Sequence, residues 1–379
     1  MGGTHQRRFL IVAGEASGDR HAARMVRALA TLGPCRLAGV AGPELAAAGV
    51  EPLAATADLA VIGFTGVLGR LPRILGVYRR LLGCLAELRP RAAVLVDSPG
   101  FNFRLGPALK RRGVPVFYYI APQVWAWHGA RARAMARWVD RLAVVFPFEE
   151  PLFRDAGVTT RFVGHPLLED LAPEVDERAL RAELGLAAGA PLLALLPGSR
   201  PAELDAHAPA MVEAARRLRA ARPALAAALA LAPGLRPGAA LARACAAAGV
   251  RVVEGRTRAL QCFARCAAVA SGTATLETAL CGTPLAVVYR TGWVNYAIAR
   301  RVVKLAHIGL PNIVAGEEVA PELIQEGFRP ERLADTLAPW IDSDAEHAAA
   351  RARLARVRER LGEPGASRRA AEWLWTLGA

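Results

Sequence analysis

Short apolar runs alternate along the chain with stretches of helical periodicity. In the first half these runs, rich in β-branched residues or leucine, lie at 8–13, 36–40, 92–97, 114–120, 141–146 and 160–163. In the second half they lie at 191–196, 224–231, 250–253, 267–270 and 284–289. Helical patterns separate them at 20–32, 71–89, 202–221 and 274–281. Because strands that alternate with helices form parallel sheets, two such series predict an α/β protein with two doubly wound domains.

The same alternation, in a chain of 379 residues, predicts the domain boundaries. The first domain is expected at 1–166 and the second at 167–343, which are ordinary sizes for single cores. The remaining stretch, 344–379, has a helical pattern and carries Trp373 and Trp375 near its end. We expect this stretch to dock on the first domain or on a second subunit, because large aromatic side chains need a surface to cover them.

Composition narrows the class of protein without deciding its function. With 53% hydrophobic and 22% charged residues the chain is globular. Its formal net charge of +14 calls for an anionic neighbour: nucleic acid, an anionic membrane surface or a phosphorylated substrate. Many arginines lie in Ala/Arg/Leu helices, where solvated faces explain them equally well, and no nucleic-acid-binding motif accompanies them. No signal peptide or transmembrane span is expected, and the six cysteines show neither metal-ligand pairs nor a disulfide framework, so we expect a cytoplasmic protein.

Two glycine-containing turns are placed to hold phosphate. GEASGD (14–19) follows the apolar run 9–13, and PGSR (197–200) follows the run 192–196. A strand, a tight Gly/Ser turn and a helix start form an anion site, because unpaired backbone N–H groups and the helix dipole converge there. One such turn is a weak signal. Two of them, one in each half, indicate paired nucleotide-type domains with a cleft between them.

Candidate acid–base chemistry in the first half lies at two strand ends. DSPGFN (97–102) places Asp97 at the carboxyl end of a strand, where open α/β sheets bind ligands. Asp97 is either a general base for a hydroxyl nucleophile or an ordinary turn residue. Glu15 and Asp19 flank the first glycine turn, and capping of the following helix is their simpler role, in which Ser17 competes.

SGTATLE (271–277) opens a helix after another strand of the second half. Ser271, Gly272 and Thr273 can offer N–H and hydroxyl donors to a diphosphate, and Glu277, one turn in, can accept both hydroxyls of a ribose. Arg200 can add a charge-assisted contact to the diphosphate. A plain capped helix is the competing interpretation.

Two aromatic or apolar segments remain. In YYIAPQVWAWH (118–128), Trp125 either lines the acceptor side of the cleft or packs the loop. The segment 59–77 is too short and too rich in arginine to span a bilayer, but it can lie in a membrane interface; a buried amphipathic helix is the alternative. Its candidate membrane-facing residues are Val61, Ile62, Phe64, Val67, Leu68 and Leu71.

Taken together, these motifs resemble one family, the lipid A disaccharide synthases, which are inverting glycosyltransferases of the GT-B type. The resemblance rests on strings that follow one another over most of the chain: VAGEASGD (12–19), GVAGP (39–43), DSPGFN (97–102), APQVWAW (121–127), FPFE (146–149), FVGHPL (162–167), LPGSR (196–200), SGTATLE (271–277), VVYR (287–290), GLPNIVAG (309–316) and PELIQ (321–325).

The resemblance implies a GT-B fold, with two Rossmann-like domains facing a central cleft, and a specific reaction. Such enzymes transfer 2,3-diacylglucosamine from its UDP derivative to 2,3-diacylglucosamine 1-phosphate (lipid X), without metal or other cofactor, forming a β-1,6-linked disaccharide and UDP. Asp97 is then the base. The UDP-binding residues are Ser199, Arg200, Ser271, Gly272, Thr273, Glu277, Asn312 and Gln325, and the acceptor side of the cleft holds Glu15, Ser17, Asn102 and Trp125.

The resemblance also implies a location, at the cytoplasmic face of the inner membrane, to which acylated, anionic substrates and the apolar segment 59–77 would draw a basic protein. The resemblance is also compatible with a homodimer. Two positions depart from the family pattern, since Gly66 and Gly100 stand where many members carry an acid. The string Asp342-Ser343-Asp344 precedes a helix and is interpreted as an N-cap, not as a metal motif. A UDP-sugar epimerase of the same fold and, more remotely, a basic nucleic-acid-binding protein remain as alternatives.

Overall fold

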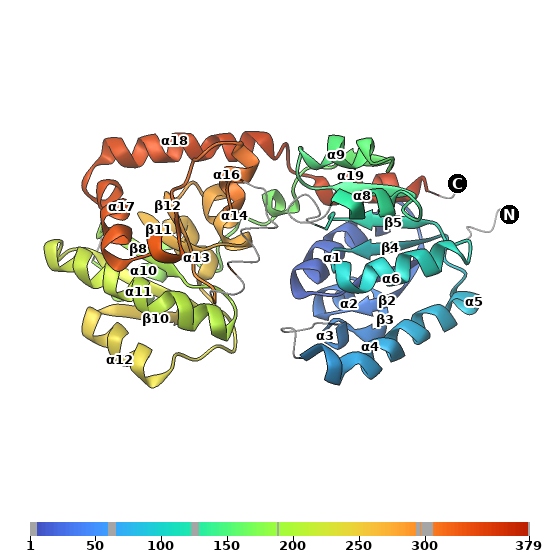
Figure 1. The fold of residues 1–379 in the computed structure, drawn as a ribbon, viewed down its shortest axis with the longest axis horizontal. Coiled ribbons are helices and arrows are strands. Elements are labelled where there is room, and N and C mark those ends of the chain that lie inside the picture. Colours follow the sequence, from blue (N-terminus) through green and yellow to red (C-terminus); the bar gives the residue numbers. More distant parts are fainter. Residues whose placement is uncertain are drawn as a thin grey trace. The chain divides into compact units, whose positions relative to one another are not determined.

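The structure is a computed structural model that describes residues 6–59, 66–122, 129–187, 189–292, 296 and 306–377. The chain divides into two compact units, one formed by Met1–Glu169 with Glu363–Ala379 and the other by Asp170–Gly362. Each unit contains one parallel sheet flanked by helices, as predicted for an α/β protein with two doubly wound domains (Figure 1). The expected boundary at 166 lies three residues before the observed division.

The sheet of the first unit has seven strands in the order β3-β2-β1-β4-β5-β6-β7. Its strands are β1 (Arg7–Ala13), β2 (Cys35–Ala41), β3 (Val50–Ala55), β4 (Ala92–Val96), β5 (Val116–Tyr119), β6 (Arg141–Val144) and β7 (Thr160–Phe162). Its helices are α1 (Ala16–Ala30), α2 (Pro43–Ala47), α3 (Thr56–Leu59), α4 (Gly66–Gly83), α5 (Leu85–Leu88), α6 (Pro99–Lys110), α8 (Gly129–Met135), α9 (Glu149–Asp155), the 3-10 helix η1 (Pro166–Glu169) and α19 (Ala366–Trp375).

The sheet of the second unit has six strands in the order β10-β9-β8-β11-β12-β13. Its strands are β8 (Leu192–Leu196), β9 (Ala226–Leu231), β10 (Val250–Glu254), β11 (Cys266–Ala270), β12 (Leu285–Tyr289) and β13 (Glu322–Ile324). Its helices are α10 (Glu177–Glu183), α11 (Pro201–Ala221), α12 (Ala239–Ala248), α13 (Thr257–Phe263), α14 (Thr273–Leu280), α16 (Leu310–Ala315), the 3-10 helix η2 (Gln325–Gly327), α17 (Pro330–Asp342) and α18 (Asp344–Arg360).

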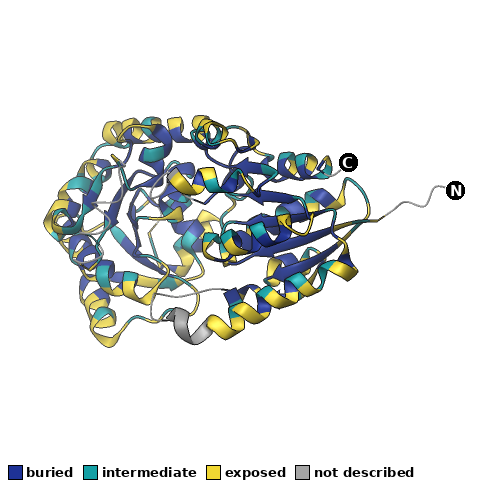
Figure 2. Ribbon diagram, turned by 45° about the vertical axis from the view of Figure 1, so that its right-hand side comes forward, coloured by how far each residue is buried: buried dark blue, intermediate teal, exposed yellow. Residues whose placement is uncertain are grey.

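The central strands of both sheets are buried on both faces, which is why they read as unbroken apolar runs. In β1 the segment from Phe9 to Ala13 has no exposed surface, and in β11 the segment from Cys266 to Val269 has none (Figure 2). Every predicted strand is present. The two strands that were not predicted, β3 and β13, lie at sheet edges.

Each sheet reverses its strand order at one point. In the first unit the order reverses between β1 and β4, and in the second unit between β8 and β11. Open α/β sheets bind ligands beside the carboxyl ends of the strands at such a reversal. The turns GEASGD and DSPGFN follow β1 and β4, and the turns PGSR and SGT follow β8 and β11. All four candidate motifs therefore lie at the two switch points.

The C-terminal stretch 344–379, expected as one docking element, is divided between the units. Helix α18 belongs to the second unit, whereas α19 belongs to the first and packs against α1 of the same chain. In α19 the Trp373 ring meets Phe117 edge-to-face at 5.7 Å, and the Arg7 guanidinium lies 3.7 Å from the centre of the Trp375 ring. The two tryptophans are therefore covered by the first unit. Among the described helices, none combines the length and apolar character needed to cross a membrane.

Candidate active site

The switch point of the first unit places the two N-terminal motifs at one level of the sheet. Strands β1 and β4 pair in parallel with Ala13 opposite Val96, so the chain leaves both strands side by side. Gly14 and Asp97 are the first residues beyond this pair. The register thus brings the first glycine turn and the DSPGFN turn together, as both motifs require if they serve one ligand.

Asp97 has a strained backbone that buried side chains hold in place. Asp97 and the following Ser98 have φ values of 45° and 47°, a left-handed conformation that non-glycine residues seldom adopt. The Asp97 carbonyl oxygen accepts hydrogen bonds from Asn102 Nδ2 at 2.7 Å and from the Tyr118 hydroxyl at 2.5 Å. Asn102 and Tyr118 have no exposed surface. Two buried donors therefore fix the strained turn, and with it the direction of the Asp97 side chain.

The surroundings of Asp97 make its carboxylate more basic than usual. Burial first and the negative charge of Glu15 second raise its pKa to about 6, against an opposing hydrogen bond from the Ser98 backbone. A carboxylate with a pKa of about 6 is ionised at neutral pH and still accepts a proton more readily than an ordinary aspartate. These are the properties of a general base.

The other acid of the first glycine turn has a structural role. Asp19 is 2% exposed, and its carboxylate accepts from the backbone N–H groups of Gly42 (2.7 Å), Glu44 (3.0 Å) and Leu45 (3.3 Å). Asp19 therefore caps α2. The prediction that it caps its own helix, α1, was wrong. Glu15 is the exposed N-cap residue of α1, and neither it nor Ser17 accepts a side-chain capping bond there.

The PGSR turn of the second unit binds a carboxylate of its own chain. The N–H groups of Ser199 and Arg200 donate to Glu203 Oε2 at 2.9 and 3.3 Å. Gly198, with a φ of 118°, admits this contact, because a Cβ there would lie 2.4 Å from the same oxygen. The backbone amides of this turn are thus occupied by a helix cap. The Arg200 guanidinium, 2.9 Å from Glu203 and largely exposed, is the part of the turn that can reach a ligand.

The turn after β11 leaves its helix uncapped. Gly272 is the N-cap residue of α14 and has no side chain to accept from the first amides of the helix. Gly272 and Thr273 are exposed, whereas the Ser271 hydroxyl donates to the Ile308 carbonyl at 3.1 Å. A helix N-terminus with uncapped, accessible amides favours an anion. This end of α14 is the better phosphate site of the two turns.

Glu277 lies in a polar cluster on the same helix. Its two oxygens accept from Arg258 Nη2 at 3.0 Å and from Gln261 Nε2 at 3.3 Å. Within the described residues, Arg258 Nη1 and Gln261 Oε1 are buried and have no partner. A carboxylate beside an unused donor and an unused acceptor suits a ligand that carries hydroxyl groups. Arg258 and Gln261, on α13, have no motif that would have identified them in the sequence.

Two of the residues predicted to bind UDP hold loops together in the structure. The Asn312 side chain is fully buried: its Nδ2 donates to the Ala320 carbonyl and to Glu322, and its Oδ1 accepts from the Val319 and Ala320 amides. Gln325, with a φ of 51°, pairs both ends of its amide with the backbone of Thr291 at 2.8 and 3.0 Å. Both side-chain amides are engaged within the chain, and their role in binding UDP stays a prediction.

A buried histidine that the sequence did not indicate joins two loops of the second unit. His207, 1% exposed, has Nδ1 at 2.7 Å from the Pro197 carbonyl and Nε2 at 3.0 Å from the Arg290 amide nitrogen. Because Nδ1 donates to the carbonyl, Nε2 is left to accept from the amide. The imidazole thus links the PGSR turn to the end of β12.

Most of the residues predicted to face the membrane lie outside the described part of the chain: Val61, Ile62, Phe64 and the side chains of Val67 and Leu68. Trp125, predicted to line the acceptor side, also lies outside it. The other predicted residue, Leu71, lies on α4 and is 48% exposed, and Leu75 of the same helix is 41% exposed. Val77 and Leu81 of α4 are buried. The described end of α4 therefore presents apolar side chains to solvent and buries others.

The Asp-Ser-Asp string caps a helix, as predicted. The Ser343 side chain accepts from the Glu346 amide at 3.2 Å at the start of α18, and the flanking acids pair with Arg222 and Arg265.

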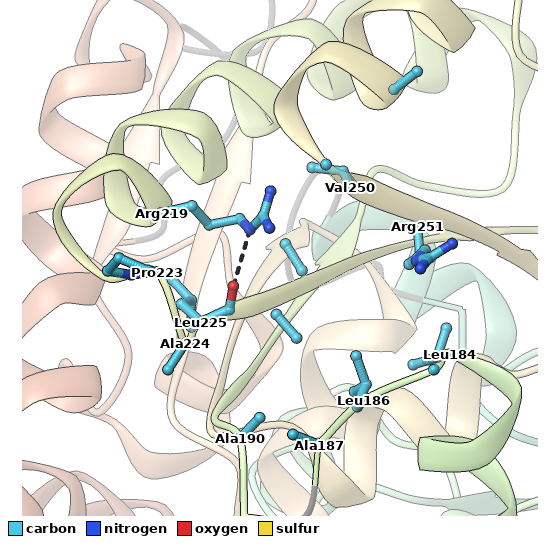
Figure 3. Close-up of a pocket in the computed structure, with 15 residues that line it drawn as sticks. Leu184, Leu186, Ala187, Ala190, Arg219, Pro223, Ala224, Leu225, Val250 and Arg251 are labelled. Carbon is cyan, nitrogen blue, oxygen red and sulfur yellow. Dashed lines mark hydrogen bonds between the residues drawn. The ribbon is translucent and has the colours of Figure 1, made fainter.

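The second unit also contains a cavity of about 460 Å³, which lies away from the candidate site. It is lined by the first residues of β9 and β10 and by the segment before β8, so it is at the amino ends of these strands. Figure 3 shows Arg219 there, with its guanidinium donating to the Leu225 carbonyl at 2.9 Å. It is therefore not part of the candidate site, which lies at the carboxyl ends.

Comparison with solved structures defines the class of protein. The fold matches UDP-GlcNAc 2-epimerase from Neisseria meningitidis bound to UDP-GlcNAc, at 12% identity, with a TM-score of 0.66 over 97% of this chain and 99% of that one. It also matches the calicheamicin glycosyltransferase CalG4, at 18% identity, with a TM-score of 0.62 over 99% and 98% of the chains. The protein therefore has the GT-B architecture of two Rossmann-like domains, which these epimerases share.

Comparison of sequences defines the family. The model of the family described as lipid-A-disaccharide synthetase matches residues 9–374. The lipid-A-disaccharide synthases of Anaeromyxobacter dehalogenans (strain 2CP-C) and Myxococcus xanthus (strain DK1622) are 47% and 45% identical to this chain, each aligned over at least 96% of both sequences. The chain belongs to the lipid-A-disaccharide synthase family, and it is a glycosyltransferase. The epimerases resemble it in fold alone.

Proposed function

We propose that the protein transfers 2,3-diacylglucosamine from UDP-2,3-diacylglucosamine to the 6-hydroxyl of 2,3-diacylglucosamine 1-phosphate. The products are the β-1,6-linked disaccharide 1-phosphate and UDP. The observation that carries the proposal, beyond family membership, is Asp97: a carboxylate at a switch point, on a strained turn fixed by buried donors, with a pKa raised to about 6. An inverting transfer needs one such base.

In this mechanism Asp97 removes the proton of the acceptor hydroxyl as the oxygen attacks the anomeric carbon of the donor. The bond from that carbon to the diphosphate breaks in the same step, so the configuration at the carbon is inverted. Asn102 is a positioning residue, because it bonds the Asp97 carbonyl and not the carboxylate. Glu15, Ser17 and Trp125 are proposed to line the acceptor side.

The second unit is proposed to bind UDP. The uncapped amides at Gly272 and Thr273 and the Arg200 guanidinium would stabilise the negative charge of the departing diphosphate, beside Ser199 and Ser271. Glu277 would accept the ribose hydroxyls, oriented by Arg258. Asn312 and Gln325 act through the loops that they hold. No metal is needed in this scheme, since amides and a guanidinium supply the positive charge.

We also propose that the protein works at the cytoplasmic face of the inner membrane. Its formal charge of +14 favours an anionic surface, and Leu71 and Leu75, which belong to the apolar segment 59–77, are exposed on α4. The protein would bind peripherally through this segment.

A detergent-micelle assay tests the reaction. The purified protein is incubated with UDP-2,3-diacylglucosamine and 2,3-diacylglucosamine 1-phosphate, and the products are identified by mass spectrometry. We expect the disaccharide 1-phosphate, and UDP release only when the acceptor is present. Asp97→Asn should retain UDP binding and lose turnover. UDP-sugar consumption that is independent of the acceptor would support an epimerase, and near-normal turnover of the variant would remove Asp97 as the base.

A further inference from the structure

A second cavity, in the first unit, lies between α4 and α6. Its volume is about 400 Å³, within the range of about 300–1,000 Å³ that is usual for small organic ligands. Its lining residues are Leu71, Ile74, Leu75 and Tyr78 of α4, Phe101, Phe103, Arg104 and Pro107 of α6, and Arg111, which directly follows α6. Apart from the two arginines and the Tyr78 hydroxyl, the lining is apolar.

The apolar lining is unusually accessible. Leu71 is 48% and Leu75 41% exposed, and both belong to the few large hydrophobic side chains that the described part of the chain leaves open to solvent. The Tyr78 and Phe101 rings, in edge-to-face contact with centroids 6.4 Å apart, join the two helices beside these residues. An open apolar cavity between two helices favours a hydrocarbon ligand, since each methylene that leaves water contributes favourably.

The charges at the cavity favour an anion. Arg104 and Arg111 are exposed, and within the described residues neither guanidinium has an acidic or carbonyl partner. Other exposed arginines of this protein pair with an acid, for example Arg154 with Glu150. Two unpaired guanidiniums beside an apolar cavity complement an amphiphile with a hydrocarbon chain and a negative charge.

The cavity is connected to the candidate base through α6. Asp97 and Ser98 immediately precede this helix, and Phe101, which lines the cavity, is in its first turn. The next residue, Asn102, donates to the Asp97 carbonyl. A ligand whose chain rests against Phe101 therefore lies on the same helical turn that positions the base. Among acylated anions, the acceptor is the one whose reacting hydroxyl must reach Asp97.

We propose that the cavity between α4 and α6 holds one acyl chain of the anionic acyl-sugar acceptor, and that Leu75 limits the length of this chain. Arg104 and Arg111 attract the negative charge of the same molecule. The inference rests on the proposed function for the identity of the acceptor, but the existence of the cavity and its preference for an acylated anion do not. A surface that only docks on a membrane would need apolar exposure but no length limit.

The first test measures binding without transfer. Octyl phosphate and dodecyl phosphate, below their micelle-forming concentrations, are titrated calorimetrically into the protein and into Leu75→Trp, which fills the cavity from an exposed position. Each buried methylene strengthens binding about four-fold, so the longer probe should bind the unmodified protein on the order of 100-fold more tightly. In Leu75→Trp this ratio should fall below about ten-fold. The matched control is Val252→Trp, an exposed apolar residue of the second unit, which should keep the original ratio.

The second test measures transfer with one donor and a series of acceptors that differ only in acyl length, in micelles of one detergent. Leu75→Trp should lower kcat/KM about ten-fold or more for long-chain acceptors and leave short-chain acceptors within about two-fold. An equal loss at every length, or an unchanged probe ratio in the binding test, overturns the cavity as an acyl site. If the unmodified protein makes no product from any acceptor, the proposed function fails, and the binding test still decides on the cavity.

Discussion

Gly14 lies directly against Ser98: a Cβ atom added at position 14 would be 2.2 Å from the Ser98 Oγ and 2.7 Å from its Cβ. The two residues belong to turns that leave adjacent strands, β1 and β4, at the switch point of the first sheet. Ser98 is also the second of two residues in a left-handed conformation, directly after Asp97. The absence of a side chain at position 14 therefore decides where the turn that carries the candidate base can lie.

Gly14→Ala should disturb this turn. The new methyl group cannot fit unless Ser98 moves, and overpacking of this kind costs about 1–3 kcal/mol of stability. Because Asp97 must move with Ser98, turnover should fall by about ten-fold or more, in keeping with the sensitivity of rates to misplacement by about 1 Å. Chemical denaturation and the micelle assay measure the two effects.

Gly100→Ala is the matched control, since it adds the same methyl group to the segment that carries Asp97, in the first turn of α6. A Cβ at position 100 meets nothing within 4 Å, so stability and turnover should change little. Equal behaviour of the two alanine variants would contradict the role assigned to Gly14.

The pH dependence of turnover should follow Asp97. Its pKa of about 6 lies above the usual value because of burial first and the Glu15 charge second. A base must be deprotonated to act, so kcat/KM should fall as the pH drops through about 6 and level off above it. Glu15→Gln removes the like charge and lowers the pKa of Asp97. The acidic limb of the pH profile of kcat/KM should therefore move to lower pH. A limb that stays in place in the variant would show that another group is titrating.

Asp97→Asn should gain stability in a pH-dependent way. A carboxylate whose pKa is raised in the folded state binds protons more readily when folded, so its charge is a cost that grows as the pH rises from about 4 to 6. The neutral amide avoids that cost, and the variant should be more stable by about 1–2 kcal/mol at pH 8, with a gain that shrinks as the pH approaches 4. Thermal unfolding at several pH values measures it; a gain independent of pH would point to a cause other than charge.

The strands were predictable because their environment is simple. A parallel strand buried on both faces needs only apolar residues, and β4 (Ala92–Val96) and the run 267–270 contain nothing else. Strand β3 escaped prediction because it lies at an edge, where Pro52 and the exposed Glu51 are tolerated. Strand β13 lies at the edge of the other sheet, and its three residues begin with the charged Glu322, so no apolar run marks it in the sequence.

The candidate site was predictable where its residues adjoin strand ends. Asp97 and the SGT turn directly follow strands, and the carboxyl end of a parallel strand implies a position in the fold. Arg258, Gln261 and His207 are on helices, where only tertiary packing determines what a side chain meets. Asn312 shows that residue type alone does not reveal what a side chain bonds to. An asparagine suits ligand binding, but four hydrogen bonds to neighbouring groups of the chain use its amide completely.

Glu277→Gln should separate donor binding from the acceptor side. The carboxylate is 15% exposed, accepts from Arg258 and Gln261, and is proposed to take the ribose hydroxyls. A neutral amide at this position weakens the charge-assisted bonds and leaves the buried Arg258 without its counter-ion, so UDP affinity should fall about 10–100-fold. The KM for the acceptor should stay within about two-fold, because the acceptor is assigned to the other unit.

Glu213→Gln is the control for this change, since it also removes a carboxylate that pairs with arginines in the second unit. Its partners Arg216 and Arg217 are on the exposed face of α11, where ion pairs contribute about 0–1 kcal/mol. Calorimetric titration with UDP should therefore give the unmodified affinity for Glu213→Gln and a weakened one for Glu277→Gln. If Glu277→Gln bound UDP normally and lost only stability, its carboxylate would serve to neutralise Arg258, and the ribose would be recognised by other groups.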